Sequence, residues 1–328
     1  MVSRQDSKSW AKENVPGLWG VHWVPFDGDN KIDRDGLRKH ARAVGSIPMQ
    51  GLSVAGMLNE LPYVSLAERR EIGEIVFDEL RETMPLYFSV TTDSLPDTVE
   101  LLNFAHDIGF DVAMAWPPPE HAKNDRLIYD YFKYLDENTP MAISAYSTPH
   151  SGRLMSPELA GRIAELESVC VIKYVTWSFA TYVAAHAAVG DNAFLSNPFE
   201  EHWLVSNHYF ENRTLYSTTA VNLYASTNGK TPLADYTEQA RLGNWPEAYK
   251  LSIEMEPLRA LWRDLYQVYE KEHMHPYAET KYWAYVVGLL DSPEVRAPQR
   301  QVSQANKQKI WSALDEAGLA VSPEPFGS

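Results

Sequence analysis

The stretch Ser168-Val169-Cys170-Val171-Ile172-Lys173-Tyr174-Val175 is the most informative part of the sequence, because it is an apolar run interrupted by a single lysine near its end. Such a run predicts a strand that is buried on both faces, as in parallel sheets covered by helices. An ammonium at the C-terminal end of this strand is costly to bury, and burial lowers a lysine pKa so that the neutral amine becomes available. Schiff-base chemistry with a carbonyl substrate requires such an amine. The alternative is that Lys173 extends to the rim or pairs with a carboxylate.

The rest of the chain repeats this strand pattern in alternation with amphipathic segments. Strands are predicted over 18–24, 51–55, 86–90, 111–115, 141–146, 169–174, 193–196 and 214–217. Helices are predicted between them, over 33–44, 66–80, 95–108, 125–135, 156–166, 179–189 and 200–210, and Ser65 and Glu68 form a capping box before the second of these. Alternating units of this number favour a closed (β/α)8 TIM barrel, an α/β fold, over an open doubly wound sheet. No GxGxxG follows the first strand, which disfavours a dinucleotide-binding fold.

After Lys230 the strand signals stop and the pattern becomes helical, with helices predicted over 232–242, 245–272, 278–290 and 303–317. No long linker rich in glycine, serine or proline precedes them. We therefore expect a barrel over residues 1–230, preceded by a short polar segment, and C-terminal helices over 231–328 that pack on the barrel.

The composition excludes several classes of protein. The 328 residues carry a net charge of −15, which argues against nucleic acid and anionic membranes as partners. No apolar run is long enough to span a membrane. A single cysteine excludes an intramolecular disulfide and a CxxC metal site, and it favours the cytoplasm as the compartment.

Chemistry in a barrel gathers at the C-terminal ends of the strands. Lys173 ends the sixth predicted strand and Tyr146 the fifth, so an imine-forming amine and a phenol that exchanges protons are expected close together. Further candidates to contact the substrate follow other strands: Gly56, Met57, Leu58, Trp116, Tyr216 and Ser217. Glu60 is expected to be a structural carboxylate that hydrogen-bonds the loop amides.

Five sequence blocks together resemble one family of barrels. They are Pro25-Phe26-Asp27-Gly28, Gly51-Leu52 with Gly56 and Glu60, Tyr146 with Pro149, Val171-Ile172-Lys173, and Gly243-Asn244-Trp245. From about Gly17 to Leu319 the chain resembles the dihydrodipicolinate synthase and N-acetylneuraminate lyase family, the class I pyruvate-dependent aldolase-type barrels. The resemblance implies that Lys173 forms the imine, that Tyr146 is the acid/base tyrosine, and that the loop after the second strand holds the substrate carboxylate. It also implies a homotetramer or a dimer of dimers. No metal or organic cofactor is expected, because the lysine supplies the electrophile.

The chain departs from the family pattern at several positions. The usual Gly-Thr-Thr-Gly-Glu loop here has Met57 and Leu58 in place of the threonines, so backbone N–H groups remain to hold an anion. The tyrosine that a neighbouring subunit supplies in the synthases falls in the run 117–119, which is all proline. The synthases' arginine aligns with Ser151, and Arg153 lies two positions further on as a substitute.

Trp116, Trp177 and Tyr216 suggest a site walled by aromatic side chains and a larger or more apolar carbonyl substrate. The sequence therefore predicts a Schiff-base-forming lyase that acts on a 2-oxo acid or a related carbonyl compound, and not a true dihydrodipicolinate synthase. Two alternatives stay open. One is a hydro-lyase that dehydrates a sugar-derived 2-keto acid through the same imine, and the other is a non-catalytic relative that binds a small ligand.

Overall fold

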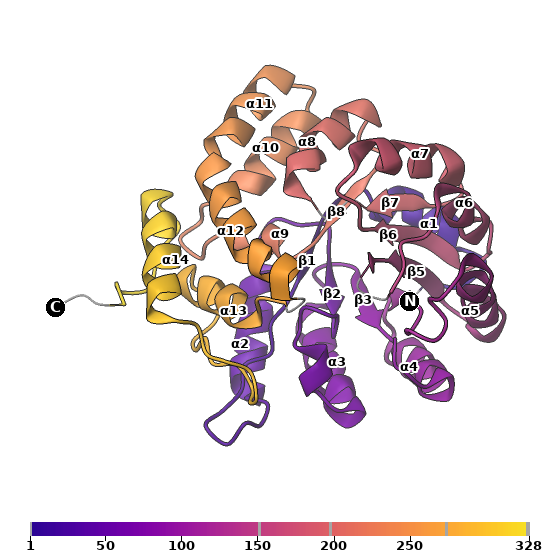
Figure 1. Cartoon of the computed structure of the whole chain (residues 1–328), viewed down its shortest axis with the longest axis horizontal. Coiled ribbons are helices and arrows are strands. Elements are labelled where there is room, and N and C mark those ends of the chain that lie inside the picture. The colour runs from indigo at the N-terminus through magenta and orange to yellow at the C-terminus, as the bar shows by residue number, and fades with distance from the viewer. Residues whose placement is uncertain (1, 150–151, 197–198, 273–274, 326–328) are drawn as a thin grey trace. The chain divides into compact units, whose positions relative to one another are not determined.

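The structure, a computed structural model, describes residues 2–149, 152–196, 199–272 and 275–325. In this part of the chain, strands β1 to β8 follow one another in order around a closed barrel (Figure 1). The pair β1·β8 and each successive pair from β2·β3 to β7·β8 are parallel. The predicted (β/α)8 barrel is confirmed. The strands are β1 (Gly17–Val21), β2 (Gly51–Val54), β3 (Leu86–Ser89), β4 (Val112–Ala115), β5 (Ala142–Ser147), β6 (Val169–Tyr174), β7 (Phe194–Ser196) and β8 (Leu215–Ser217).

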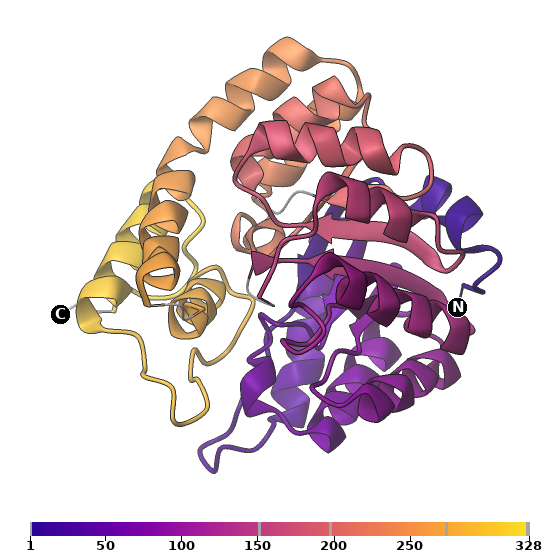
Figure 2. The same cartoon turned by 45° about the vertical axis from the view of Figure 1, so that its right-hand side comes forward.

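Helices fill the connections between the strands, as the alternating pattern predicts. They are α2 (Arg34–Gly45), η1 (Leu61–Tyr63), α3 (Leu66–Leu80), α4 (Leu95–Ile108), α5 (Asp125–Asn138), α6 (Pro157–Ala164), α7 (Phe179–Val189) and α8 (Glu200–Tyr209). The capping box before α3 is present: the backbone N–H of Ser65 donates to Glu68 Oε2 over 2.8 Å, and the N–H of Glu68 donates to Ser65 Oγ over 3.2 Å. Figure 2 shows α5, α6 and α7 side by side along one flank of the strands.

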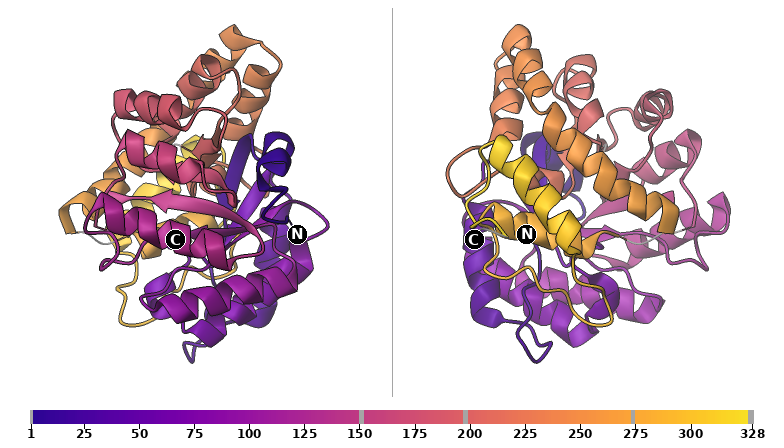
Figure 3. Two further views of the ribbon diagram at one scale, coloured as in Figure 1. Left: turned by 90° about the vertical axis from the view of Figure 1, so that its right-hand side faces the viewer. Right: turned by 60° about the vertical axis from the view of Figure 1, so that its left-hand side comes forward.

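The C-terminal part is helical, as predicted, with α9 (Ala220–Leu223), α10 (Pro232–Arg241), α11 (Trp245–Glu254), α12 (Glu256–Glu272), α13 (Tyr277–Val286) and α14 (Gln304–Glu316). α12 and α13 both pack on α14 (Figure 3). The sequence predicts one helix over 245–272, and this is wrong: the helix is interrupted at Met255, between α11 and α12. Pro257 explains the break, because proline lacks the N–H of a helix interior and clashes with the preceding turn.

A helix at the N-terminus, α1 (Ser7–Asn14), was not predicted from the polar sequence there. Contacts with the barrel hold it. Ser7 Oγ donates to the Glu167 carbonyl over 2.7 Å, and Lys8 Nζ donates to the Asn192 carbonyl over 2.9 Å. Because these partners are distant in sequence, tertiary packing and not an amphipathic pattern accounts for this helix.

By its internal contacts the chain divides into two compact units. The strand unit comprises residues 1–19, 50–54 and 84–218, with the barrel strands apart from the last two residues of β1, and α1 and α4 to α8. The helix unit comprises residues 20–49, 55–83 and 219–328, with α2, η1, α3 and α9 to α14. The boundary at residue 230 that the sequence suggested stays a prediction.

The barrel interior of the strand unit is closed by large side chains. The rings of Trp19 and Tyr87 lie 4.1 Å apart between centroids, and both residues are fully buried. A Cβ at Gly51 would overlap the Trp19 ring, so glycine is needed there for the tryptophan to enter. Burial of each such side chain stabilises the fold by about 1.5–3 kcal/mol. The continuous apolar runs thus form the strands that they predict.

Candidate active site

Lys173 and Tyr146 lie side by side, each one residue before the end of its strand, on β6 and β5. Tyr146 is the register partner of Lys173, so both side chains leave the same face of the sheet. Lys173 Nζ lies 4.9 Å from the centroid of the Tyr146 ring. The two residues are only 7% and 8% exposed. The structure therefore brings together the amine and the phenol that the strand ends indicate.

The Lys173 amine is buried without a counter-ion among the described residues. Burial lowers the pKa of Lys173 to about 8, and no neighbouring carboxylate opposes this shift. With this pKa, about a tenth of the lysine side chains are neutral at pH 7, compared with about one in several thousand for an exposed lysine. A neutral amine of this kind can attack a carbonyl carbon.

Trp116, directly after β4, packs against Tyr146. The two rings meet edge to face, with 5.7 Å between centroids and an angle of 83°. The Trp116 backbone is fixed by Thr91, whose hydroxyl accepts from the Trp116 N–H over 2.7 Å and donates to the Trp116 carbonyl over 3.0 Å. Trp116 thus orients the phenol beside Lys173.

Two serines near the strand ends have buried hydroxyl groups without a hydrogen-bond partner in the described part of the chain: Ser196 on β7 and Ser217 on β8. Ser196 is the register partner of Lys173 on β7, the neighbour of β6 on the side away from β5 and Tyr146. A buried hydroxyl without a partner is costly, so these oxygens are suited to a bound ligand or water. The sequence pointed to Ser217 but not to Ser196, although Ser196 ends a predicted strand.

The predicted aromatic wall is formed in part. Trp177 is 53% exposed and stacks on Phe199, with 3.5 Å between ring centroids. Tyr174 points away from its neighbour Lys173 along the strand, and its hydroxyl donates to the Met155 carbonyl over 2.6 Å. Among the aromatic residues expected to line the site, Trp116 contacts Tyr146 beside Lys173.

Two further predicted substrate contacts have partners within the strand unit. The Tyr216 ring lies 5.8 Å from that of Trp203, and Tyr216 is 1% exposed. Arg153 Nε donates to Asp125 Oδ1 over 2.9 Å, and the guanidinium is half exposed. Ser151, with which the synthases' arginine aligns, lies outside the described residues.

The loop after β2, residues 55–60, belongs to the helix unit and has a constrained backbone. Ala55 and Glu60 have left-handed φ angles of 53° and 57°. Such angles are unfavourable for residues other than glycine, by roughly 1–3 kcal/mol each, and persist where the surroundings impose them. His22 is one such surrounding group, because its Nε2 accepts from the Ala55 N–H over 3.2 Å and its carbonyl accepts from the Asn59 side-chain amide. Burial lowers the pKa of His22 to about 4, so the ring is neutral at pH 7.

The backbone amides of this loop differ in what they contact. The Gly56 N–H donates to Asn59 Oδ1 and is engaged within the loop. The N–H groups of Met57 and Leu58 have no acceptor among the described residues. The Met57 carbonyl accepts from the Tyr277 hydroxyl over 3.1 Å. Met57 and Leu58 are therefore loop positions whose amides remain available to an anion.

Glu60 makes different contacts from those that the sequence suggested. It was expected to hydrogen-bond the loop amides, but within the described chain its carboxylate pairs with Lys281 of α13, with 2.6 Å between Oε1 and Nζ. Glu60 and Lys281 are 1% and 0% exposed. A buried carboxylate requires such a partner, and the loop amides alone do not supply it.

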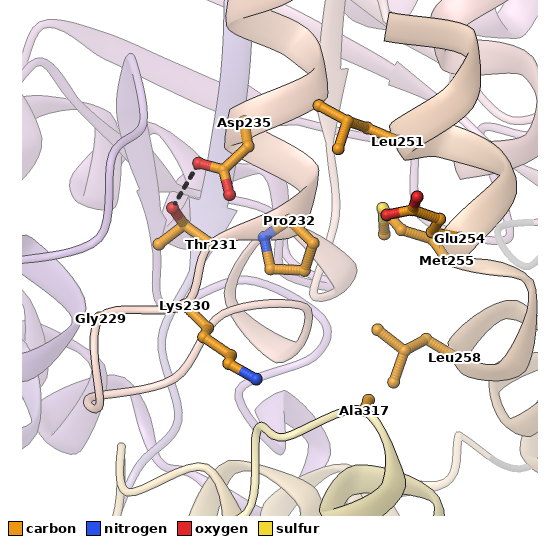
Figure 4. A pocket seen from close by; sticks show the side chains of 10 residues that line it. All are labelled: Gly229, Lys230, Thr231, Pro232, Asp235, Leu251, Glu254, Met255, Leu258 and Ala317. Carbon is orange, nitrogen blue, oxygen red and sulfur yellow. Dashed lines mark hydrogen bonds between the residues drawn. The ribbon is translucent and has the colours of Figure 1, made fainter. Parts of the chain in front are cut away.

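A cavity of about 420 Å³ lies within the helix unit, between α10, α11, α12 and the end of α14 (Figure 4). None of the predicted site residues lines it. Lys230 is one of the residues that line the cavity. Its ammonium group occupies the space that a Cβ at Gly318, just after α14, would take. A cation at the C-terminal end of a helix is stabilised by the helix dipole, which explains its position without a ligand.

Among the described residues, no group of three or more histidine, cysteine, aspartate or glutamate side chains is arranged to hold a metal ion. No helix in the same part of the chain has the length and apolar character needed to cross a membrane.

The sequence matches one known protein family over most of its length. The model of the dihydrodipicolinate synthetase family matches residues 14–317. The chain belongs to this family. The resemblance that the sequence blocks carry is thereby confirmed, and the family is one of aldolase-type lyases.

Individual members of the family are distant. A 4-hydroxy-tetrahydrodipicolinate synthase from Methanopyrus kandleri is 24% identical over 314 residues, which is 93% of this chain and 97% of that enzyme. A second synthase, from Methanothrix thermoacetophila, is 26% identical over 163 residues, 49% of this chain and 55% of its own length. An N-acetylneuraminate lyase from Fusobacterium nucleatum is 26% identical over 167 residues, 50% of this chain and 58% of the lyase. For the last two, the match thus spans little more than half of the relative.

Among solved structures, the chain is similar to a prophage protein of the dihydrodipicolinic acid synthase family from E. coli K12 in complex with pyruvate. The TM-score is 0.81 at 16% identity, over 93% of this chain and 99% of that one. At this identity the likeness shows a shared fold.

Proposed function

We propose that the protein is a Schiff-base-forming lyase of the aldolase type, in which Lys173 forms an imine with a 2-oxo acid or a related carbonyl compound. The observation that carries the proposal is the buried Lys173 amine beside Tyr146, which has no counter-ion among the described residues. Membership in a family of aldolase-type lyases supports it, as does the structural relative that was solved in complex with pyruvate.

The proposed reaction begins when the neutral Lys173 amine attacks the substrate carbonyl carbon and the carbonyl oxygen takes up a proton. The resulting carbinolamine loses its oxygen as water, and a protonated imine remains. This cation accepts the electron pair of a breaking bond next to the former carbonyl carbon, so that a C–C bond is cleaved, or formed in reverse. Tyr146 is proposed to exchange protons with the carbinolamine oxygen, a role for which a positioned phenol is suited.

A substrate other than that of a true dihydrodipicolinate synthase is part of the proposal. Met57 and Leu58 offer no hydroxyl groups, the run 117–119 contains no tyrosine, and Arg153 is paired with Asp125. Trp116 beside Tyr146 supports an apolar or aromatic group on the substrate. Anion binding by the loop after β2 stays a prediction from the resemblance.

Borohydride trapping tests the function. The protein is incubated with pyruvate and with a panel of aromatic and sugar-derived 2-keto acids, reduced, and digested for mass spectrometry. A secondary amine on the Lys173 peptide is expected for at least one compound, and Lys173→Arg should remove it while the circular dichroism spectrum is retained. No adduct with any compound would contradict the imine and favour a ligand-binding relative. Analysis of the products separates bond cleavage from loss of water.

A homotetramer or a dimer of dimers is proposed on the family resemblance. Sedimentation of the 37.2 kDa chain measures this directly. A cytoplasmic location is also proposed, because Cys170, the single cysteine of the sequence, is a free thiol and the chain can form no intramolecular disulfide.

A further inference from the structure

We propose, on the basis of the function proposed above, that the buried ion pair Glu60–Lys281 is a positioning device that holds the Met57 and Leu58 amides in the conformation that binds the substrate carboxylate. Lys281 and Glu60 act through the loop and do not themselves contact the substrate. All of these residues belong to the helix unit.

Glu60 is fixed on both carboxylate oxygens. Oε1 pairs with Lys281 Nζ over 2.6 Å. Oε2 accepts from the backbone N–H of Arg296 over 3.3 Å and from the side-chain amide of Gln299. The carboxylate therefore has one fixed location, and the left-handed backbone of Glu60 is held there by groups from outside the loop.

Lys281 is in turn anchored at a second point. Nζ donates to the Glu294 carbonyl over 2.6 Å and lies 4.5 Å from the centroid of the Phe26 ring. The Arg296 guanidinium lies 4.3 Å from the centroid of the same ring. The Phe26 ring thus contacts both cations, and Lys281 links it to the Glu60 carboxylate.

Arg296 extends this support to the segment after the loop. Its guanidinium donates to the Tyr63 carbonyl over 2.7 Å and to Glu68 Oε1 over 2.7 Å. The Glu68 hydrogen bonds with Arg296 hold the pKa of that carboxyl to about 2, so it stays charged. The loop is therefore held at Ala55 by His22 and at Glu60 by Lys281, while its middle carries the two available amides.

The anchoring explains how the loop can function without threonine hydroxyl groups. Backbone amides bind an anion well when they are preorganised, because no conformational freedom is lost on binding. If Glu60 left its left-handed conformation, the peptide groups before it would rotate. A change at Lys281 should therefore weaken carboxylate binding even though the lysine lies outside the binding loop.

An amide titration tests this inference separately from imine formation. The protein is labelled with 15N-methionine in a Lys173→Arg background, and the Met57 resonance is assigned by its loss in Met57→Leu. Pyruvate is then added, with methyl pyruvate as the neutral control. Pyruvate should shift the Met57 resonance, methyl pyruvate should not, and Lys281→Met should weaken the pyruvate response by about tenfold or more.

Each outcome of the titration decides the inference. An unchanged pyruvate affinity in Lys281→Met overturns it and leaves the ion pair a structural role, which would lower the melting temperature without changing the titration. The absence of any Met57 shift with pyruvate also overturns it. Failure of the proposed function is a different result, the lack of a borohydride adduct on Lys173 in the unaltered protein.

Two further variants keep the test interpretable. If Lys281→Met does not fold, Glu60→Gln/Lys281→Met takes its place, because that pair leaves no buried charge without a partner. The double variant should show the same weakened response to pyruvate. Arg42→Met is the matched control, since it breaks the ion pair with Glu79 at α3, away from the loop. It should leave the pyruvate titration unchanged.

Discussion

Two buried lysines, Lys173 at the end of β6 and Lys281 on α13, differ in one feature of their surroundings. Both have less than a tenth of their surface exposed, and burial lowers the pKa of both. Lys281 has the Glu60 carboxylate at 2.6 Å, which opposes that shift, whereas Lys173 has the face of the Tyr146 ring. The presence of a counter-ion separates a lysine that holds structure from one that is available for chemistry.

The comparison also explains why burial alone is a poor guide to catalytic lysines. A paired ammonium gains stability from its partner, and its amine is not free to attack a carbonyl. An unpaired one destabilises the folded state, so such a residue is expected where its reactivity is used.

The largest expected effect on stability comes from Lys281→Met. This change leaves the Glu60 carboxylate buried without its partner, which should lower the free energy of unfolding by about 3–5 kcal/mol at pH 7. Urea denaturation measures it.

The matched control for that variant is Lys309→Met, which breaks the half-exposed pair with Asp264 and should change the stability by less than about 1 kcal/mol. Equal losses in the two variants would show that the Glu60–Lys281 pair has no special weight.

Tyr146→Phe tests whether the surroundings of Lys173 supply a proton donor. The ring is retained, and with it the contacts with Lys173 and Trp116, but the hydroxyl group is lost. Single-turnover imine formation should slow by about 10²- to 10³-fold. An unchanged rate, measured by quenching with borohydride at short times, would assign proton transfer to another group.

Lys173→Met should stabilise the protein, in contrast with Lys281→Met. The folded-state pKa of about 8 lies below the 10.5 of an exposed lysine, so burial of the ammonium destabilises the fold at neutral pH, where the lysine is charged in the unfolded state. From these values the gain at pH 7 is about 3 kcal/mol.

The stabilisation by Lys173→Met depends on pH, because the lysine pKa differs between the folded and the unfolded state. The gain from Lys173→Met should be complete below about pH 8, should shrink between pH 8 and 10.5, and should vanish above that range. Thermal denaturation at pH 7 and pH 10 checks this. A destabilised variant at pH 7 would indicate a counter-ion for Lys173.

The smallest expected effect is the pH dependence of imine formation in the unaltered protein. The rate should rise about tenfold per pH unit up to about pH 8 and then level off, because the neutral amine is the nucleophile. A rate that continues to rise toward pH 10 would indicate a lysine with an ordinary pKa.

The barrel and the Lys173–Tyr146 pair could be predicted from the sequence because each depends on local patterns. Continuous apolar runs form the strands, and residues at the ends of neighbouring parallel strands meet at the same edge. The break at Met255 also had a local signal in Pro257, which the helical spacing of its neighbours obscured.

The partner of Glu60 could not be predicted in the same way. Lys281 lies on a helix far along the chain, and no periodicity links it to the loop after β2. The exposure of Trp177 likewise depends on its packing against Phe199 in another connection. Contacts of this kind arise from tertiary packing, for which the local pattern carries no signal.

Peptide mapping after borohydride reduction of the unaltered protein tests the central distinction most directly. The protein is saturated with the 2-keto acid that gives the strongest trapping, reduced, digested and sequenced by tandem mass spectrometry. The peptide with Lys173 should carry the reduced adduct, and the peptide with Lys281 should not. An adduct on Lys281, or on neither lysine, would contradict the claim that an unpaired buried amine at the end of β6 is the nucleophile.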